Sequence, residues 1–175
     1  IDEKHPVQPF LLYGATKLAG EHYCRVMNQE YGVKTVILRL SDLYGPGNGR
    51  GSAPNVFVEN AFLGRPLVVR GGGAQMRTYT FIADAVEAFL LAIDNQNAWG
   101  QTFNIGGAEC ISIGELAERA ARTAGSEINI FHENDAPDRR CYLISSEKAK
   151  KVLGYKPRVS IERGLESIKK DLVHK

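Results

Sequence analysis

The chain has 175 residues and a net charge of +2, with 43% hydrophobic and 24% charged residues. These values are ordinary for a globular domain with its own core, and they give no charge bias towards nucleic acid or a membrane surface. The longest apolar stretch, Ala88–Ile93, is far too short to span a bilayer, and no signal-peptide pattern opens the sequence. We expect neither a nucleic-acid partner nor a membrane span.

The three cysteines, Cys24, Cys110 and Cys141, lie far apart and form no Cys-x-x-Cys motif. An odd number without paired spacing argues against a disulfide framework and against a zinc site. We predict three reduced thiols and no metal in a cytoplasmic protein. The opening segment, Ile1–Pro9, is polar, contains two prolines and lacks a starting methionine, so we expect a fragment or a chain whose front is missing.

The first half of the chain alternates helix and strand. Tyr13–Glu30 has helical spacing and is followed by a stop signal at Gly32. Lys34–Leu40 is a short apolar run rich in β-branched residues, which is typical of a buried strand in a parallel sheet. We then expect a loop, a helix, a strand, a turn and a strand at Gly45–Gly51, Pro54–Leu63, Leu67–Val69, Gly71–Gly73 and Arg77–Ile82.

The second half continues this alternation with shorter elements. Ala83–Asn95 predicts an amphipathic helix, with apolar side chains at Val86, Phe89, Leu90 and Ile93. The elements expected after it are a strand at Thr102–Ile105, a helix capped by Ser112 and Glu115 that ends near Gly125, a strand at Ile128–Phe131, a loop at Glu133–Arg140, and helices at Ser146–Leu153 and Ile161–Val173. The pattern places the chain in the α/β class, with a small lobe at the end of a sheet.

Tyr13 and Lys17 stand four residues apart at the start of the first helix, so both project from one face. A free phenol has a pKa of about 10 and is a poor base near neutral pH. An ammonium group about 6 Å away favours the phenolate by roughly 3 kcal/mol at an effective dielectric of about 20. A tyrosine with such a neighbour can take a proton from an alcohol while hydride leaves the same carbon.

The spacing alone is also compatible with an ordinary surface lysine and a half-buried tyrosine. Its context favours the chemical interpretation. The sequence resembles the extended short-chain dehydrogenases/reductases, specifically the NAD-dependent nucleotide-sugar epimerases and dehydratases such as UDP-glucose 4-epimerase. The motifs that carry the resemblance occur in the family's order at Pro9–Glu21, Val36–Gly47, Gly64–Leu67 with Gly71–Asp84, Phe103–Gly106 and Lys148–Pro157.

The resemblance implies the C-terminal part of a Rossmann-type parallel sheet with a small α/β substrate-binding lobe. Residues 1–45 and 83–107 would belong to the sheet, and residues 46–82 and 108–175 to the lobe. The family's glycine-rich turn for the NAD pyrophosphate is absent from the sequence. Gly71–Gly73 does not replace it, because no convincing helix follows. We therefore expect this chain alone to be inactive. The resemblance further implies that the full-length protein is a homodimer, because related enzymes commonly pair through the Tyr–Lys helix. Tyr23 and Met27 could belong to such a contact or be buried against the chain's own sheet.

The resemblance also assigns site residues. Tyr13 would be the catalytic base, and Lys17 would orient the cofactor ribose and stabilise the phenolate. Arg77 and Arg140, with Arg139 as the near alternative for the latter, would bind the diphosphate of a nucleotide sugar, because a guanidinium presents a planar fork of donors. Asp42 would lie near the cofactor and substrate where the family often has Asn, which leaves its contact open. The cofactor would be NAD, with NADP not excluded.

Several functions share the first step, in which the sugar 4-hydroxyl is oxidised to a 4-keto group. The chain could belong to a 4-epimerase, a 4,6-dehydratase or a UDP-glucuronate decarboxylase. The loop Tyr44–Asn48 lacks the arginine expected of the decarboxylases, and we favour C4 epimerisation of a UDP-hexose. A non-catalytic relative that senses a nucleotide or cofactor is the alternative of another class, although such a relative would be expected to lose the Tyr13–Lys17 pair. A structural domain with a chance motif is disfavoured by five motifs in order.

Overall fold

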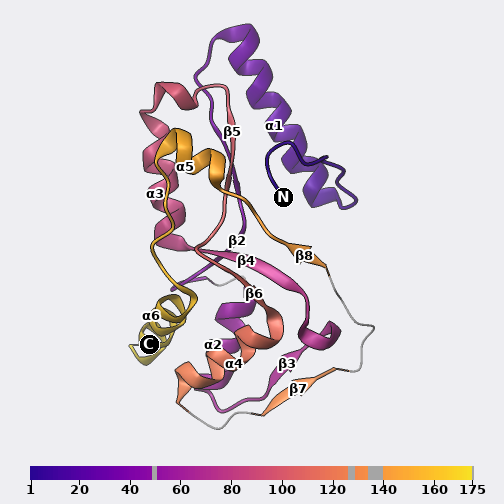
Figure 1. The fold of residues 1–175 in the computed structure, drawn as a ribbon, viewed down its shortest axis with the longest axis vertical. Coiled ribbons are helices and arrows are strands. Elements are labelled where there is room, and N and C mark those ends of the chain that lie inside the picture. Colours follow the sequence, from indigo (N-terminus) through magenta and orange to yellow (C-terminus); the bar gives the residue numbers. More distant parts are fainter. Residues whose placement is uncertain (49–50, 126–128, 134–139, 175) are drawn as a thin grey trace.

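The computed structural model describes residues 1–48, 51–125, 129–133 and 140–174 (Figure 1). Helices and strands alternate along this part of the chain, as expected for the α/β class. In chain order the elements are α1 (Leu12–Tyr31), β1 (Ile37–Leu40), β2 (Asp42–Tyr44), α2 (Ala53–Phe62), β3 (Leu67–Val69), the 3-10 turn η1 (Gly71–Gly73), β4 (Met76–Phe81), α3 (Ile82–Ile93), the 3-10 turn η2 (Gln96–Ala98), β5 (Thr102–Ile105), β6 (Cys110–Ser112), α4 (Ile113–Ala124), β7 (Ile130–His132), β8 (Cys141–Tyr142), α5 (Glu147–Leu153) and α6 (Ile161–Val173).

Strands β1 and β5 pair in parallel, in register from Ile37 opposite Thr102 to Leu40 opposite Ile105. Helix α1 lies on one side of this pair, and α3 and α5 lie on the other (Figure 1). The core between the strands and α3 and α5 is made of small alanines and a few large side chains, which are Ala88, Ala92, Ala98, Phe103, Ile105, Ala149, Leu153 and Tyr155.

Strand β4 is the centre of the second sheet. Its C-terminal half pairs in parallel with β2, and its N-terminal half pairs with β6 in antiparallel and with β8 in parallel. Strands β3 and β7 form a separate parallel pair. Helices α2, α4 and α6 pack together, with α2 and α4 between the β4–β6 strands and the β3–β7 pair (Figure 1). Their core includes Tyr44, Phe57, Val58, Leu67, Leu116 and Leu165.

Local signals explain the helix ends. Helices α1, α4 and α5 each end at a glycine in the left-handed region, as at Gly32 with φ of 67°. Ser112 caps α4 by accepting a hydrogen bond from the Glu115 amide, as the capping box predicts. The predicted glycine turn is the 3-10 turn η1 between β3 and β4.

The exposed side of α3 differs from what its apolar pattern suggests. Val86, Phe89, Leu90 and Ile93 are 48–65% exposed. The buried alanines of the same helix are Ala85, Ala88 and Ala92. Alanine faces the strand pair because a short side chain lets the helix approach the sheet closely. The predicted strand at Lys34–Leu40 also begins later, at Ile37. Ile128 of the predicted strand and most of the predicted loop at Glu133–Arg140 lie outside the described residues.

Buried Asp84 joins α3 to the segment before α6. The residue is 2% exposed, and its carboxylate accepts hydrogen bonds from the amides of Arg158 and Val159 at 3.0 and 3.2 Å. Two amide donors satisfy a carboxylate that burial would otherwise penalise. This contact fixes the chain between the two packed regions of the molecule.

Candidate active site

Tyr13 and Lys17 occupy the first two turns of α1 and are neighbours in space. The Lys17 ammonium lies 5.3 Å from the centroid of the Tyr13 ring, the separation that residues four apart on a helix produce. The Tyr13 side chain is 70% exposed, so its hydroxyl is open to a reactant. Gly14 allows the start of the helix to approach Pro9, because a Cβ at position 14 would be 2.9 Å from the proline Cβ.

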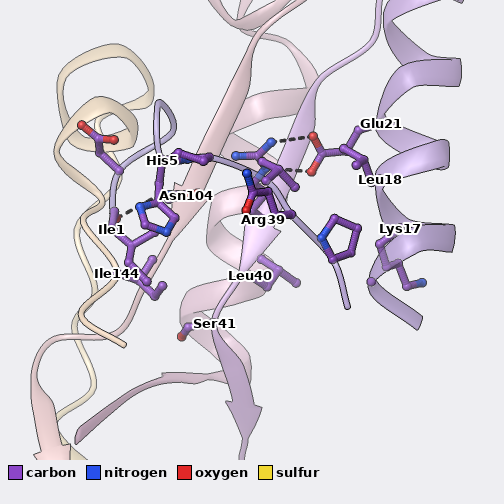
Figure 2. A pocket seen from close by; sticks show the side chains of 16 residues that line it. Ile1, His5, Lys17, Leu18, Glu21, Arg39, Leu40, Ser41, Asn104 and Ile144 are labelled. Atoms are coloured by element: carbon purple, nitrogen blue, oxygen red, sulfur yellow. Dashed lines mark hydrogen bonds and ion pairs between the residues drawn. The ribbon is translucent and has the colours of Figure 1, made fainter. Parts of the chain in front are cut away.

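A pocket of about 760 Å³ lies beside Tyr13. The ends of β1 and β2 and the loop after β2 form its other walls, and Asp42 and Asn48 face it. A second pocket of about 350 Å³ is lined by Lys17, with its walls formed by α1, β1 and the first nine residues (Figure 2). Leu40 and Ser41 line both pockets, so the tyrosine and the lysine border two adjoining cavities at the carboxyl end of β1.

Ser41 is held where the pockets meet. Its hydroxyl is 2.7 Å from the Thr80 hydroxyl of β4, and Thr80 donates to the carbonyl of Ile105 at 3.3 Å. The contact joins the two sheets at the ends of their strands. No role was predicted for Ser41 or Thr80, although both lie inside the motifs at Val36–Gly47 and Gly71–Asp84. The signal for Ser41 was its position next to Asp42 at a strand end.

Arg77 and Arg140 are brought together by the pairing of β4 with β8. Arg77 donates from Nη1 to the Arg140 carbonyl at 3.2 Å, and its guanidinium lies 4.6 Å from the Tyr142 ring centroid. Arg77, Asp42 and Tyr142 line a third pocket of about 320 Å³. The Arg140 side chain is exposed, and Arg139 lies outside the described residues.

Asp42 lies between the predicted catalytic residue Tyr13 and the predicted diphosphate ligand Arg77. It lines the pocket that contains Tyr13 and the pocket that contains Arg77. Its charge also acts on Tyr79: burial, followed by the charge of Asp42, raises the pKa of that phenol well above its ordinary value. Tyr44 has a raised pKa mainly because of burial as well. Both phenols stay protonated near neutral pH and can donate hydrogen bonds but cannot act as bases.

The arrangement suits acid–base chemistry on an alcohol next to a bound anion. An exposed phenol with an ammonium neighbour lines one pocket. A guanidinium held against an aromatic ring lines another pocket that shares Leu40, Ser41 and Asp42 with the first. Among the described residues, no three His, Cys, Asp or Glu side chains are grouped as metal ligands. No helix in the described part of the chain is long and apolar enough to cross a lipid bilayer.

The family model described as the NAD dependent epimerase/dehydratase family matches residues 1–106, which include Tyr13, Lys17, Asp42 and Arg77. The chain belongs to the NAD dependent epimerase/dehydratase family. Members of this family with different activities are similar to it, so membership alone does not choose among the reactions.

Two curated relatives illustrate this spread. The chain is 31% identical to an uncharacterized UDP-glucose epimerase, YtcB of Bacillus subtilis, over 94% of its own length and 52% of the relative's. It is 32% identical to a dTDP-glucose 4,6-dehydratase of Neisseria gonorrhoeae, over 93% of its length and 51% of that protein's. The chain thus spans about half the length of the curated relatives it matches.

The fold is shared with a solved family member. The UDP-glucuronic acid 4-epimerase of Bacillus cereus, in complex with UDP-glucuronic acid and NAD, superimposes with a TM-score of 0.89 at 29% identity. The match covers 99% of this chain and 56% of the epimerase. The α/β architecture expected from the sequence, a part of a Rossmann-type fold, is confirmed.

Proposed function

We propose that the protein carrying this chain converts a nucleotide sugar through a 4-keto intermediate with NAD, and that the reaction is C4 epimerisation of a UDP-hexose. One observation carries the proposal: Tyr13 and Lys17 border two adjoining pockets that share Leu40 and Ser41. One pocket offers a place for the sugar beside the phenol, and the other a place for the nicotinamide ribose beside the ammonium. NADP is not excluded as the cofactor.

In this proposal Tyr13 takes the proton from the sugar 4-hydroxyl. Lys17, 5.3 Å from the ring centroid, stabilises the phenolate and binds a ribose hydroxyl. The bound nicotinamide supplies the hydride acceptor and donor. Tyr13 returns the proton when the 4-keto group is reduced on its other face, which inverts the carbon.

The two arginines bind the diphosphate of the substrate. Arg77 is held in place by its contacts with the Arg140 carbonyl and the Tyr142 ring, and a guanidinium presents a planar fork of donors that suits phosphate oxygens. Arg140 directly precedes β8, and its carbonyl accepts hydrogen bonds from the Met76 amide and from Arg77. Asp42, between the diphosphate and the phenol, contacts the sugar or the nicotinamide. We further propose that residues 1–45 and 83–107 serve as sheet elements and residues 46–82 and 108–175 as the substrate lobe of a cytoplasmic homodimer.

A 4,6-dehydratase is the second candidate, because the relative from Neisseria gonorrhoeae carries that activity in its name. The same phenol would perform the first step. The 4-keto group would then acidify the neighbouring carbon, and water would leave. Decarboxylation of UDP-glucuronate and non-catalytic sensing of a nucleotide are the remaining alternatives.

The test is turnover of UDP-glucose, UDP-galactose, dTDP-glucose and UDP-glucuronate with NAD by the full-length protein, with the products separated by chromatography. We expect UDP-glucose and UDP-galactose to interconvert. Tyr13→Phe should lower kcat by at least about 100-fold, because it removes the acid–base group. Tyr31→Phe is the matched control, since Tyr31 is equally exposed at the far end of the same helix. A 4-keto-6-deoxy product from dTDP-glucose would select the dehydratase, and an active Tyr13→Phe protein would contradict the assigned base.

A further inference from the structure

Helix α1 is held in place by few contacts. None of the twenty residues of α1 is fully buried, and its apolar side chains Leu18 and Met27 are half-buried. Thr35 donates to the carbonyl of Cys24 near its C-terminal end. Towards the N-terminal end, the tie between α1 and the strands is an ion pair between Glu21 and Arg39 of β1.

The ion pair is a two-point contact (Figure 2). Arg39 donates from Nε to Glu21 Oε1 and from Nη2 to Oε2, both at 2.7 Å. The two side chains are only 22% and 14% exposed. Hydrogen bonding from Arg39 lowers the pKa of Glu21, so the carboxylate stays charged across the neutral range. A planar fork on a carboxylate fixes direction as well as distance, which a single point charge does not.

The Glu21–Arg39 pair lies where it can set the position of Tyr13 and Lys17 relative to β1. Tyr13, Lys17 and Glu21 follow one another at intervals of four, so they lie in one row along α1. On the other side, Arg39 directly precedes Leu40 and Ser41, which line both pockets. A roll or slide of α1 would move the whole row relative to the end of β1.

We propose that the Glu21–Arg39 pair is a positioning device that sets the rotation and depth of α1 and so aligns Tyr13 and Lys17 over the end of β1. The role of the aligned groups rests on the proposed function. The alignment itself rests on a two-point contact within this chain, two turns from the phenol.

The test replaces the fork while keeping the charge. Arg39→Lys retains a cation but cannot make two parallel hydrogen bonds, so we expect kcat to fall about tenfold or more with KM within about twofold, because a small misplacement of reacting groups slows chemistry more than binding. Arg25→Lys is the matched control. Arg25 also contacts Glu21, at 2.8 Å, but from within α1, so it does not tie the helix to β1. Its kcat should stay within about twofold of the parent.

A second measurement does not depend on turnover. Amide hydrogen exchange over residues 12–21 should become faster in Arg39→Lys and stay unchanged in Arg25→Lys, because only the former releases the helix. Glu21→Gln removes the carboxylate that accepts both hydrogen bonds from Arg39, so it should also speed amide exchange over residues 12–21. This variant provides the answer if Arg39→Lys does not fold. Unchanged exchange in these fork variants, or an unchanged kcat in an active protein, would overturn the proposal. Absence of turnover in the parent would instead refute the proposed function and leave the exchange result to decide the role of the pair.

Discussion

Gly107 follows β5 and packs directly against the backbone of β4. A Cβ at this position would lie 1.8 Å from the Tyr79 carbonyl oxygen, which a rigid central strand cannot avoid. We expect Gly107→Ala to lower the free energy of unfolding by about 3 kcal/mol, as overpacking against immovable atoms does. Urea unfolding followed by circular dichroism measures this effect.

Gly20 provides the opposite control. It lies in the exposed interior of α1, with open space around its Cβ position and a helical backbone. Gly20→Ala should raise the free energy of unfolding by about 0.5 to 1 kcal/mol, because alanine loses less backbone entropy in a helix. Equal effects of the two substitutions would show that the close approach at Gly107 is not a constraint.

At the scale of single residues, the sequence predicted the site residues to which the family resemblance gives a role. Tyr13, Lys17, Asp42 and Arg77 all line the pockets at the strand ends. It did not predict the partners that hold the site together, such as Thr80 beneath Ser41. Such contacts join side chains that are about 40 residues apart in sequence, and no local pattern announces them.

At the scale of elements, the attachment of α1 depends on the charged carboxylate of Glu21, and acid should weaken it. The pKa of Glu21 is lowered, first by its hydrogen bond from Arg39 and further by the charges of Arg39 and Arg25. A carboxyl with a lowered pKa in the folded state stabilises the fold above its unfolded pKa, about 4.3 for glutamate, and this contribution is lost as pH falls through the folded value. We expect the stability of the parent protein to fall more steeply than that of Glu21→Gln as pH falls below about 4.3.

The measurement is the free energy of unfolding in urea at pH values from 6 to 3 for both proteins. Glu162 also has a lowered pKa, mainly from a backbone hydrogen bond, but it is present in both proteins and cancels in the comparison. Parallel pH profiles would mean that Glu21 contributes no pH-dependent stability.

The helices and longer strands were predictable because their apolar spacing and their caps are local. Three short strands, β2, β6 and β8, were not predicted. Each has only two or three residues, too few for a period, and each exists because β4 offers a free edge to pair with. The orientation of α3 could not be inferred either. Its alanines and its large apolar residues lie on different faces, and either face could have packed against the sheet.

At the scale of the whole molecule, α1 and α3 lie on opposite sides of the β1–β5 pair (Figure 1). Both helices expose large apolar side chains. On α1, Tyr23 is 67% exposed and Met27 is half-buried. The sequence left open whether these side chains cover the chain's own sheet or a second subunit. We expect the proposed homodimer to place these two side chains of α1 in its subunit contact.

We expect Tyr23→Arg to convert the dimer to a monomer in sedimentation velocity, because an unpaired charge in an apolar interface is costly. Leu90→Arg is the matched control: Leu90 has a similar exposure of 65%, but lies on α3. Dissociation by Leu90→Arg alone would place the subunit contact on α3. A monomeric parent protein would contradict the proposed dimer.

The parallel pairing of β1 with β5 also bears on how the chain folds. About sixty residues separate the two strands, and that interval contains β2, α2, β3, β4 and α3. Joining strands so far apart costs loop entropy before their contacts repay it. Pairing of β2 with β4 inside the interval shortens the loop that must close. We therefore expect the β1–β5 pair and the pockets at its carboxyl end to form late in refolding, and regain of activity by the full-length protein to lag behind regain of helix.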